Sequence, residues 1–288
     1  SVDKWEIKTH VEDEGKQILP DIAETVLAKI REKGLDKGEI EGIGIGVPGP
    51  VEENGEIACA VNLHWGRKNI EKELEDMTGL RVKAGNDANV AALGEMWKGG
   101  GQGAKNLILV TLGTGVGGGI IINEKIVTGA HGAGGEIGHA PVNPEEKVPC
   151  NCGNKGCLEQ YASATGIARL ARKALEETDS PSALRKYPDV TAKDVFDAYK
   201  EGDELAEEVV EVFSEYMGRA LAAFTCVTDP DVIVLGGGVS KAGQPLIDCV
   251  EKYYRNYAFP TCKETPIRLA TLGNDAGVYG AAKLVLNK

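Results

Sequence analysis

Apolar runs and amphipathic stretches alternate along the first hundred residues of the chain. Ile43–Val47 is predicted to be a buried strand, and residues 20–33 before it place apolar side chains at helical spacing and end at Gly34. Further strands are predicted at 4–10 and 81–84, and further helices at 69–77 and 88–97. Strands and helices that alternate at these lengths are typical of an α/β fold with a mainly parallel sheet.

The pattern changes after residue 105. Residues 106–112 form an apolar run, and the glycine run at 113–119 and two short apolar segments follow, which predicts a meander of hairpins. Helices are then predicted at 167–177, 192–199, 204–226, 244–254 and 275–286, with strands at 232–235 and 267–271. The glycine-rich polar stretch at 99–105 separates the two halves and predicts a domain boundary there.

Composition narrows the class of partner. The 288 residues are 42% hydrophobic and 26% charged, as in ordinary globular proteins, but the net charge is −12. This charge disfavours nucleic acid and anionic membranes, because both attract a basic surface. The sequence shows no apolar signal segment and no run of transmembrane length, so we expect a cytoplasmic protein that does not bind membranes.

Three cysteines, Cys150, Cys152 and Cys157, lie within eight residues, and a histidine lies a short loop upstream. A Cys₃His set is a typical closed tetrahedral site for structural zinc. The alternatives are a disulfide and buried free thiols. Because the seven cysteines are odd in number and the other four are scattered, we favour a reducing compartment and zinc.

Two glycine loops are candidate nucleotide sites. Gly113-x-Gly115-x-x-Gly118 matches the dinucleotide fingerprint, but a strand follows it instead of a helix, so we reject a Rossmann site. Glycines at a hairpin tip can still present backbone N–H groups to phosphates, helped by the Thr111 and Thr114 hydroxyls; a plain hairpin turn is the alternative. Residues 236–238 follow a strand and could admit a flat ring or a phosphate, although close packing explains them equally well.

Asp87 stands between a predicted strand and a predicted helix. As a structural residue it would be the helix N-cap, and the same N–H donors and the helix dipole would keep it ionised. A carboxylate at the carboxyl end of a strand in an α/β sheet is also well placed to act as a general base. Position alone leaves both readings open.

Seven segments together resemble the ROK family of sugar kinases and related repressors, most closely its bacterial glucokinases. In chain order they are Gly46-Val-Pro-Gly49, Asn62-Leu63, Asn86-Asp87-Ala-Asn89, Thr111-Leu-Gly-Thr-Gly-Val-Gly117, Gly132-Ala-Gly-Gly-Glu-Ile-Gly-His139, Cys150-x-Cys-Gly-x-x-Gly-Cys-x-Glu159 and Leu272-Gly-Asn-Asp-Ala-Gly277. Each could arise by chance, but their joint order is specific, and the resemblance covers the chain from Val2 onward.

The resemblance implies an actin-like (ribonuclease H-like) two-domain α/β fold with a cleft between the domains, usually as a homodimer. We expect a small domain at 1–104, completed by the C-terminal helix at 275–288, and a large domain with the zinc loop at 105–274. By the same resemblance Asp87 is the base that takes the proton of the sugar's 6-hydroxyl. The residues implied to contact the sugar are Gly49, Asn62, Asn86, Asp87, Glu136, His139 and Glu159.

The nucleotide and metal sites are implied in the same way. His139 would use one ring nitrogen for zinc, with Cys150, Cys152 and Cys157, and the other for the sugar. Mg²⁺ would accompany ATP, since phosphoryl transfer depends on charge neutralisation. The residues implied to hold ATP are Thr111, Gly113, Thr114, Gly115 and Gly117 at the phosphates and Gly236, Gly237, Gly238 and Val239 at the adenosine.

Kinases of this family begin with a strand and a phosphate loop of the form Asp-x-Gly-Gly-Thr, and the sequence contains no such motif. It opens at Ser1, where family members are already in their third strand. Removing a central strand would expose a large apolar surface, at about 25 cal/mol per Å², so we expect the natural protein to possess this segment.

The leading hypothesis is therefore ATP-dependent phosphorylation of glucose at O6. A kinase for mannose, fructose or an N-acetylated hexosamine such as N-acetylmannosamine is an alternative, because one substituent changes the pocket in ways that sequence does not show. A sugar-binding pseudokinase is the next alternative and rests on the missing loop. A repressor is disfavoured by the net charge of −12 and by the lack of room for a DNA-binding domain before Val2.

Overall fold

A computed structural model describes residues 3–286 of the chain, which fall into two compact units. Unit 1 comprises the chain up to Gly94, the segment Thr128–Gly134 and the chain from Asp275 onward. Unit 2 comprises Glu95–Val127 and Gly135–Asn274. Each unit is described below by itself.

Unit 1 is built around two parallel strands, β1 (Ile43–Val47) and β4 (Val82–Asn86), which pair from Ile43 with Val82 to Val47 with Asn86. Helices α1 (Ile18–Glu32) and α2 (Ile70–Thr78) pack on each other, and α9 (Ala276–Leu286) packs on β1 and β4. Two short strands, β2 (Glu56–Ile57) and β3 (Lys68–Asn69), form a separate hairpin. The C-terminal helix thus lies in the same unit as the first hundred residues, although it ends the chain.

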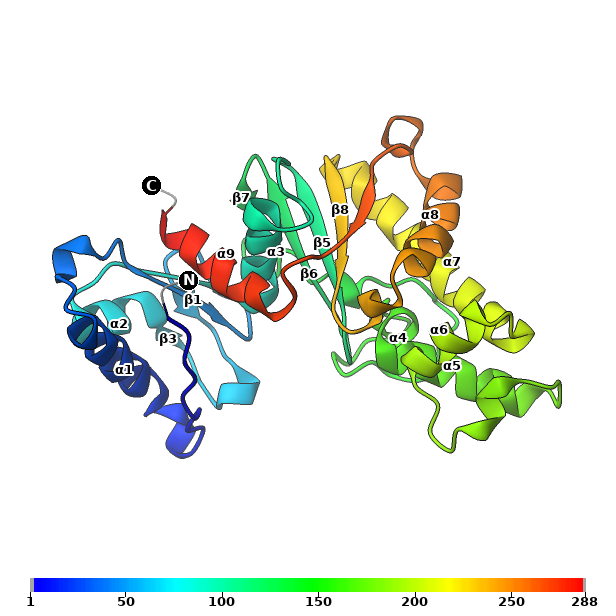
Figure 1. The fold of residues 1–288 in the computed structure, drawn as a ribbon, viewed down its shortest axis with the longest axis horizontal. Helices are drawn as coiled ribbons and strands as arrows, with labels where there is room; N and C mark the ends of the chain where they lie inside the picture. The colour runs from blue at the N-terminus through cyan, green and yellow to red at the C-terminus, as the bar shows by residue number, and fades with distance from the viewer. Residues whose placement is uncertain (1–2, 287–288) are drawn as a thin grey trace. The chain divides into compact units, whose positions relative to one another are not determined.

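Unit 2 contains a five-stranded sheet in the order β7-β6-β5-β8-β9. Strands β5 (Leu107–Leu112), β8 (Val232–Gly236) and β9 (Ile267–Leu269) are parallel, whereas β6 (Val116–Ile122) and β7 (Lys125–Ile126) form the antiparallel meander that the sequence predicts. The helices α5 to α8 lie on one side of this sheet (Figure 1). Their bounds are Ala164–Glu177, Ala192–Lys200, Glu204–Thr228 and Gln244–Tyr257.

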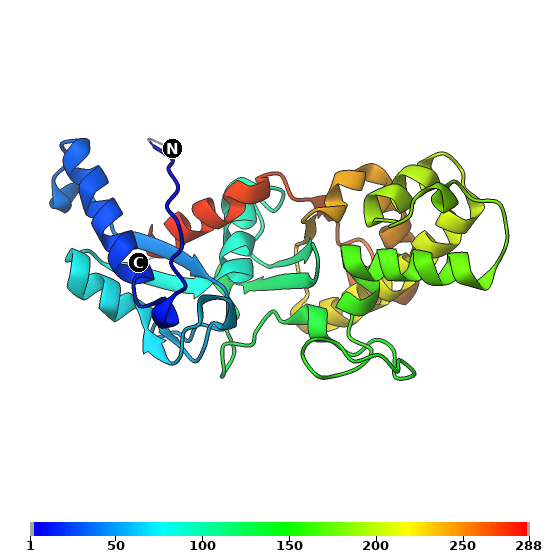
Figure 2. The ribbon, with the colours of Figure 1, turned by 90° about the horizontal axis from the view of Figure 1, so that it is seen from below.

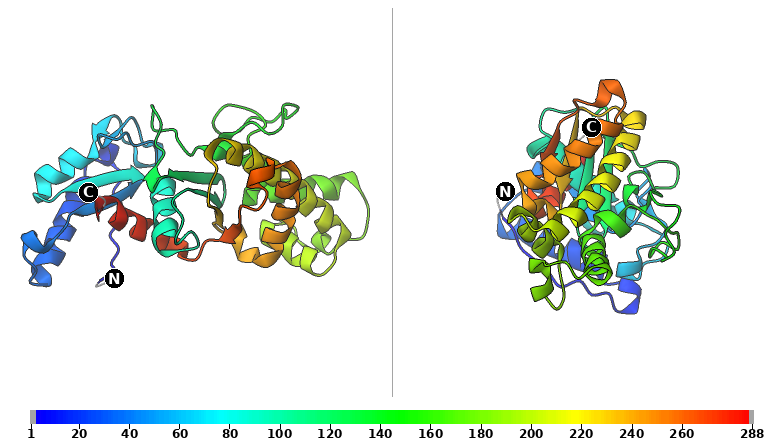
Figure 3. Two further views of the ribbon diagram at one scale, coloured as in Figure 1. Left: turned by 90° about the horizontal axis from the view of Figure 1, so that it is seen from above. Right: turned by 90° about the vertical axis from the view of Figure 1, so that its right-hand side faces the viewer.

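The core of unit 2 forms where these helices cover the sheet. Ile108, Val110 and Leu112 of β5 alternate along one face and are fully buried in one apolar cluster with Phe213 of α7 and Val250 of α8. The two helices run side by side in the right panel of Figure 3. Leu107 and Leu109, which point to the opposite face, are buried as well, so both faces of β5 are covered, as is typical of parallel strands in α/β proteins.

The strand predicted at residues 4–10 is wrong. Within residues 3–286 this segment enters no strand ladder and runs as an extended chain. Side chains hold it against α1, where Trp5 Nε1 donates to Thr25 Oγ1 at 3.0 Å and His10 Nδ1 lies 2.8 Å from Asp21 Oδ2. An alternating pattern fits any chain that packs one side on a helix, so alternation alone does not distinguish it from a strand.

The first boundary between the units lies at Gly94–Glu95, inside α3 (Asp87–Lys98), whereas the sequence pattern places it at residue 104. The Glu95 side chain accounts for the difference. It is buried, and its carboxylate accepts hydrogen bonds from the N–H groups of Gly100 (2.8 Å), Thr271 (3.1 Å) and Leu272 (2.9 Å). The glycine-rich stretch is thereby tied into unit 2 and does not act as a linker.

Within residues 3–286 no helix is both long and apolar enough to span a membrane.

Candidate functional site

The unit 1 part of the candidate site lies where β1 and β4 end. Because the strands are parallel, the loop that follows β1 and the start of α3 meet at one edge, and Asn86 Nδ2 donates to the Gly49 carbonyl oxygen at 3.2 Å. Gly49 has φ +112°, and a Cβ there would lie 2.8 Å from the Cys59 carbonyl oxygen. A side chain at this position would therefore be strained and crowded, which explains the glycine.

Of the two readings that the sequence leaves open for Asp87, the N-cap reading is wrong, because Asn86 caps α3. The Asn86 Oδ1 accepts hydrogen bonds from the N–H groups of Ala88 (3.0 Å) and Asn89 (3.1 Å). Asp87 is exposed, and its Oδ1 accepts from the N–H of the adjacent Ala88 at 2.8 Å. Because Asn86 caps the helix, the Asp87 carboxylate remains exposed at the end of β4. There it can accept a proton from a bound molecule.

Asn62 lies on a separate loop of unit 1. Ala60 and Trp65 close this loop by exchanging two backbone hydrogen bonds, of 3.0 and 3.1 Å, and Asn62 is exposed within it. The buried Trp65 anchors the loop, since its Nε1 donates to the Gly15 carbonyl oxygen at 3.0 Å. The described contacts do not join Asn62 to Asn86.

The predicted metal ligands converge in unit 2. The donor atoms of His139, Cys150, Cys152 and Cys157 all lie within 4.8 Å of one another. The Cys152 and Cys157 sulfurs are 3.6 Å apart, and His139 Nδ1 is 3.7 Å from the Cys150 sulfur. Two sulfurs on one tetrahedral zinc are about 3.8 Å apart, since Zn–S bonds are about 2.3 Å long, so the cluster fits the ion.

Burial and hydrogen bonds affect the three thiols differently. Burial, with a hydrogen bond to Glu159, raises the pKa of the Cys150 thiol, and burial also raises the pKa of Cys157. The Asn154 N–H lowers the pKa of the exposed Cys152. Zinc is ligated by thiolates, so binding of the ion would require these thiols to release their protons.

The metal cluster adjoins two of the expected sugar ligands. His139 ends a short 3₁₀ helix (Ile137–His139), and Glu159 begins the single-turn helix α4 (Glu159–Ala162). The Glu159 Oε1 accepts from the Cys150 sulfur at 2.8 Å and lies 3.7 Å from His139 Nδ1. Glu136, one residue before the 3₁₀ helix, is exposed. In Figures 2 and 3 the green loop of residues 140–158 stands out from the rest of unit 2.

The glycine run is shorter as a hairpin tip than the sequence suggests, because Gly117, Gly118 and Gly119 lie within β6. A Cβ on Gly118 would be 2.3 Å from Ile137 Cγ1 and 2.7 Å from the Gly135 carbonyl oxygen. This glycine is therefore needed for the close approach of β6 to the segment with Glu136 and His139.

The tip itself is residues 113–115, beside Thr111 at the end of β5. The Gly113 N–H donates to the Gly115 carbonyl oxygen at 3.0 Å, and the Gly113 carbonyl oxygen accepts from Ala164 N–H at 2.8 Å. The loop is thereby fixed to the start of α5. A Cβ on Gly115 would lie 2.7 Å from Glu159 Oε2, so Gly115 and Glu159 are neighbours.

Two cavities of unit 2 border the predicted nucleotide and sugar residues. One, of about 510 Å³, includes Thr114, Gly115 and Glu159 in its lining, together with Gln160 and Arg169. The other, of about 320 Å³, is bordered by Gly238 and Val239 and by side chains of α6 and its cap. The residues of the second cavity that sequence reasoning missed include Thr191, Phe196, Lys200 and Lys241.

Gly236 and Gly237 do not line that cavity. Gly237 has φ +82°, and a Cβ on it would be 2.5 Å from the Leu112 carbonyl oxygen. Its role is the close approach of the β8 turn to the end of β5, which is the packing alternative that the sequence left open.

The comparisons with known proteins agree with this arrangement. The sequence profile of the ROK family matches residues 4–288. A glucokinase of Halalkalibacterium halodurans is 48% identical over 289 residues, which cover 99% of this chain and 88% of that protein.

Two solved structures are similar over nearly the whole chain. The ROK hexokinase of Thermus thermophilus superposes with a TM-score of 0.78 at 34% identity, covering 97% of this chain and 88% of that one. The ROK family glucokinase of Streptomyces griseus, solved with glucose and AMPPNP, gives 0.75 at 32% identity, covering 99% and 91%. The fold is the actin-like two-domain α/β fold, and the chain belongs to the ROK family.

Proposed function

We propose that the protein transfers the γ-phosphoryl group of ATP to the 6-hydroxyl of glucose. The observation that carries the proposal is the 48% identity with a curated glucokinase over 99% of the chain. The similar Streptomyces griseus glucokinase, solved with glucose and an ATP analogue, supports the same substrate pair.

Asp87 is the proposed general base. It is exposed at the carboxyl end of β4, and Asn86 relieves it of capping the helix, so its carboxylate is available to a substrate hydroxyl. Removing the 6-hydroxyl proton as the oxygen attacks phosphorus is general base catalysis, which contributes about 10²–10⁴-fold.

The residues proposed to contact the sugar are those that the resemblance implies. They are Gly49, Asn62, Asn86 and Asp87 in unit 1, and Glu136, His139 and Glu159 in unit 2. The adjacency of Glu159 and His139 supports the unit 2 part, because their side chains are already oriented by one cluster. With His139 Nδ1 facing the thiols, Nε2 is the nitrogen proposed to face the sugar.

The nucleotide is proposed to bind unit 2. Its adenosine would enter the 320 Å³ cavity beside Gly238 and Val239, and its phosphates would lie near Thr114 and Gly115, with Mg²⁺ neutralising their charge. Thr111, Gly113, Gly117, Gly236 and Gly237 would shape these segments. Zinc held by His139, Cys150, Cys152 and Cys157 would have a structural role, as closed four-ligand sites do.

The expected cytoplasmic location and the expected homodimer both stay predictions. Light scattering of the purified protein tests the dimer. The two compact units are the proposed domains of the kinase, with α9 completing the first.

The activity test is coupled ADP release from Mg-ATP with glucose, mannose, fructose, N-acetylglucosamine and N-acetylmannosamine offered separately. We expect turnover with glucose, and we expect Asp87→Asn to lower kcat by about 10²–10⁴-fold without loss of folding, since the base is lost and the cap is kept. Turnover confined to another hexose would replace glucose in the proposal. Silence on every sugar, with sugar binding retained, would identify a pseudokinase.

A further inference from the structure

The loop between the ligands His139 and Cys150 buries one charged side chain. Pro144, Glu145 and Lys147–Pro149 are exposed, whereas the Glu146 side chain is only 11% exposed. Burying a carboxylate is costly unless donors surround it, so its partners indicate what it does.

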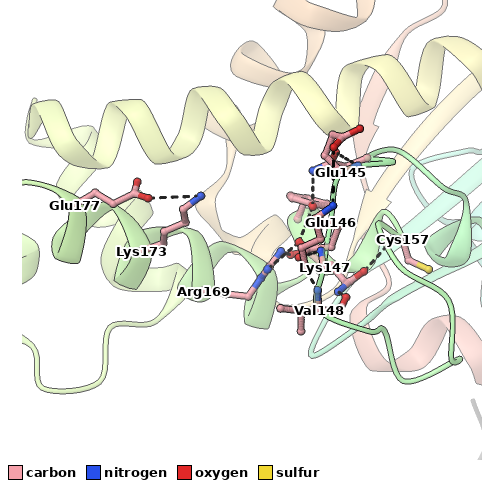
Figure 4. A network of polar contacts seen from close by, with 11 residues as sticks. Glu145, Glu146, Lys147, Val148, Cys157, Arg169, Lys173 and Glu177 are labelled. Atoms are coloured by element: carbon pink, nitrogen blue, oxygen red, sulfur yellow. Dashed lines mark hydrogen bonds and ion pairs between the residues drawn. The ribbon is translucent and has the colours of Figure 1, made fainter.

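Glu146 joins the loop to two helices. One carboxylate oxygen accepts from the N–H groups of Lys147 (2.9 Å) and Val148 (3.0 Å). The other accepts from the Tyr161 hydroxyl of α4 (2.6 Å) and from Arg169 Nη1 of α5 (3.0 Å) (Figure 4). The carboxylate thus shapes its own loop with one oxygen and fixes that loop to α4 and α5 with the other.

The charge of Glu146 is stable in this setting. Burial alone would raise its pKa, but donation by Tyr161, Val148 and Arg169 outweighs burial and lowers the pKa to about 2. Burial and the neighbouring carboxylate raise the pKa of Tyr161 to about 12, so its hydroxyl stays a donor. Charge-assisted hydrogen bonds of this kind are roughly twice as strong as neutral ones.

Gln160 connects the same loop to Cys157, the last cysteine of the cluster. Its Nε2 donates to the Val148 carbonyl oxygen at 2.9 Å, and its Oε1 accepts from the Cys157 N–H at 3.1 Å. Arg169 Nη2 donates to the Gln160 carbonyl oxygen at 2.9 Å. We call the segment that ends in Cys150 and the segment that ends in Cys157 the two arms of the cluster. Both arms therefore depend on one set of contacts.

These contacts hold the two residues that follow Glu159 in the chain. Glu159 begins α4, a helix of a single turn, and Gln160 and Tyr161 are the next two residues. One helical turn is marginal by itself, so its direction is set by what holds its side chains. Tyr161 is further fixed by stacking on Tyr216, with ring centroids 4.1 Å apart.

We propose that Glu146 is a positioning residue that aims Glu159 at the sugar by holding α4 and the metal loop in one arrangement. It acts through Tyr161, Arg169 and its own loop backbone and does not touch the sugar. The proposal rests on the proposed function of the Glu159 site, and it assigns a role to a loop residue that the sequence motifs do not include.

The test compares Glu146→Gln with Glu145→Gln, its exposed neighbour on the same loop. Glutamine keeps the shape of Glu146 but loses the charge and turns one acceptor into a donor. We expect the Kd and KM for glucose to rise about tenfold, because charged hydrogen bonds are lost around Glu159, while kcat stays within about twofold. Isothermal titration with sugar alone, steady-state kinetics and zinc content by mass spectrometry are measured on each purified protein.

Zinc content is expected to be unchanged in both variants, since all four ligands remain, and Glu145→Gln is expected to match wild type. Unchanged glucose affinity in Glu146→Gln, a loss confined to kcat, or loss of zinc would each overturn the positioning role. If Glu146→Gln does not fold, Tyr161→Phe decides, because it removes one hydroxyl and is expected to weaken sugar binding severalfold.

The same data distinguish failure of the positioning role of Glu146 from failure of the proposed kinase function. If wild type turns over another hexose, the titrations use that sugar. Binding and turnover by wild type, with equal affinity in Glu146→Gln, would reject only the positioning role. No binding of any hexose by wild type would reject both.

Discussion

At the scale of single residues, Glu146 links the stability of unit 2 to pH. Its carboxylate has a folded-state pKa of about 2, below the ordinary value of 4.5. A lowered pKa means that the ionised side chain stabilises the fold above pH about 4.5, and that this contribution is lost as the pH falls through about 2. The difference of about 2.5 in pKa corresponds to at most about 3–4 kcal/mol.

We therefore expect wild type to exceed Glu146→Gln in unfolding free energy by the largest margin near pH 7. The margin should shrink between pH about 4.5 and about 2, because the unfolded chain then binds a proton that the folded one does not. Urea unfolding of both proteins at pH 7, 4 and 3 measures this margin, and acid effects that the two proteins share cancel in the difference. A margin that does not change with pH would contradict the ionisation of Glu146.

The convergence of His139, Cys150, Cys152 and Cys157 was predicted from residue identity, because the four are close in the sequence and a Cys₃His set is typical of zinc sites. The sequence left open whether Asp87 caps the helix, since Asn86 and Asp87 are both good cap residues and only the backbone geometry selects Asn86. Glu146, Thr191 and Lys241 could not be found, because their partners come from segments distant in sequence.

At the scale of elements, β6 and the 3₁₀ helix Ile137–His139 approach so closely that Gly118 has no room for a side chain. We expect Gly118→Ala to lower the unfolding free energy by about 1–3 kcal/mol, since overpacking displaces Ile137 or the Gly135 carbonyl. The displaced helix carries His139, so glucose affinity should also fall. Urea unfolding and glucose titration measure the two effects.

The matched control for this change is Gly38→Ala, where an added Cβ meets nothing within 4 Å. It should leave stability and sugar affinity close to wild type. If Gly118→Ala were as stable as Gly38→Ala, the close approach of β6 and residues 135–137 would be refuted.

Apolar runs predicted β5 and β8, which are almost continuously buried, and apolar side chains at helical spacing predicted α7. It failed at residues 4–10, where one side of an extended segment packs on α1 without a strand partner among the described residues. It also assigned Gly117–Gly119 to a loop, since glycine inside a strand gives no apolar signal and is explained only by the neighbour that requires it.

At the scale of the whole molecule, the two units cannot be delimited by sequence order. The segment Thr128–Gly134 and the chain from Asp275 belong with the first ninety-four residues. The buried Glu95 carboxylate joins residues 100, 271 and 272, which are far apart in the chain. The sequence therefore predicts a domain boundary at the glycine-rich stretch 99–105, although hydrogen bonds to Glu95 hold its backbone within unit 2.

The division into units makes a prediction about metal removal. The four ligands and Glu159 all belong to unit 2, His139 and Cys150 flank the loop of residues 140–149, and Glu159 accepts a hydrogen bond from the Cys150 sulfur. Chelation of zinc should therefore loosen residues 135–160 and weaken glucose binding, whereas α2 and the β1–β4 pair of unit 1 should keep their protection. Hydrogen exchange before and after chelation, with release of one zinc per chain followed by a dye, measures this.

The controls separate the metal from thiols in general. Cys59→Ser and Cys226→Ser change exposed cysteines outside the cluster and should retain zinc, while Cys150→Ser should lose it and show the exchange pattern of the chelated protein. A metal bound by His139, Cys150, Cys152 and Cys157 must restrict both arms at once, because each arm alone offers too few donors for a closed tetrahedral site. Loss of protection spread evenly over both units, or a chelated protein that binds glucose as before, would mean that the cluster does not order the sugar-binding residues.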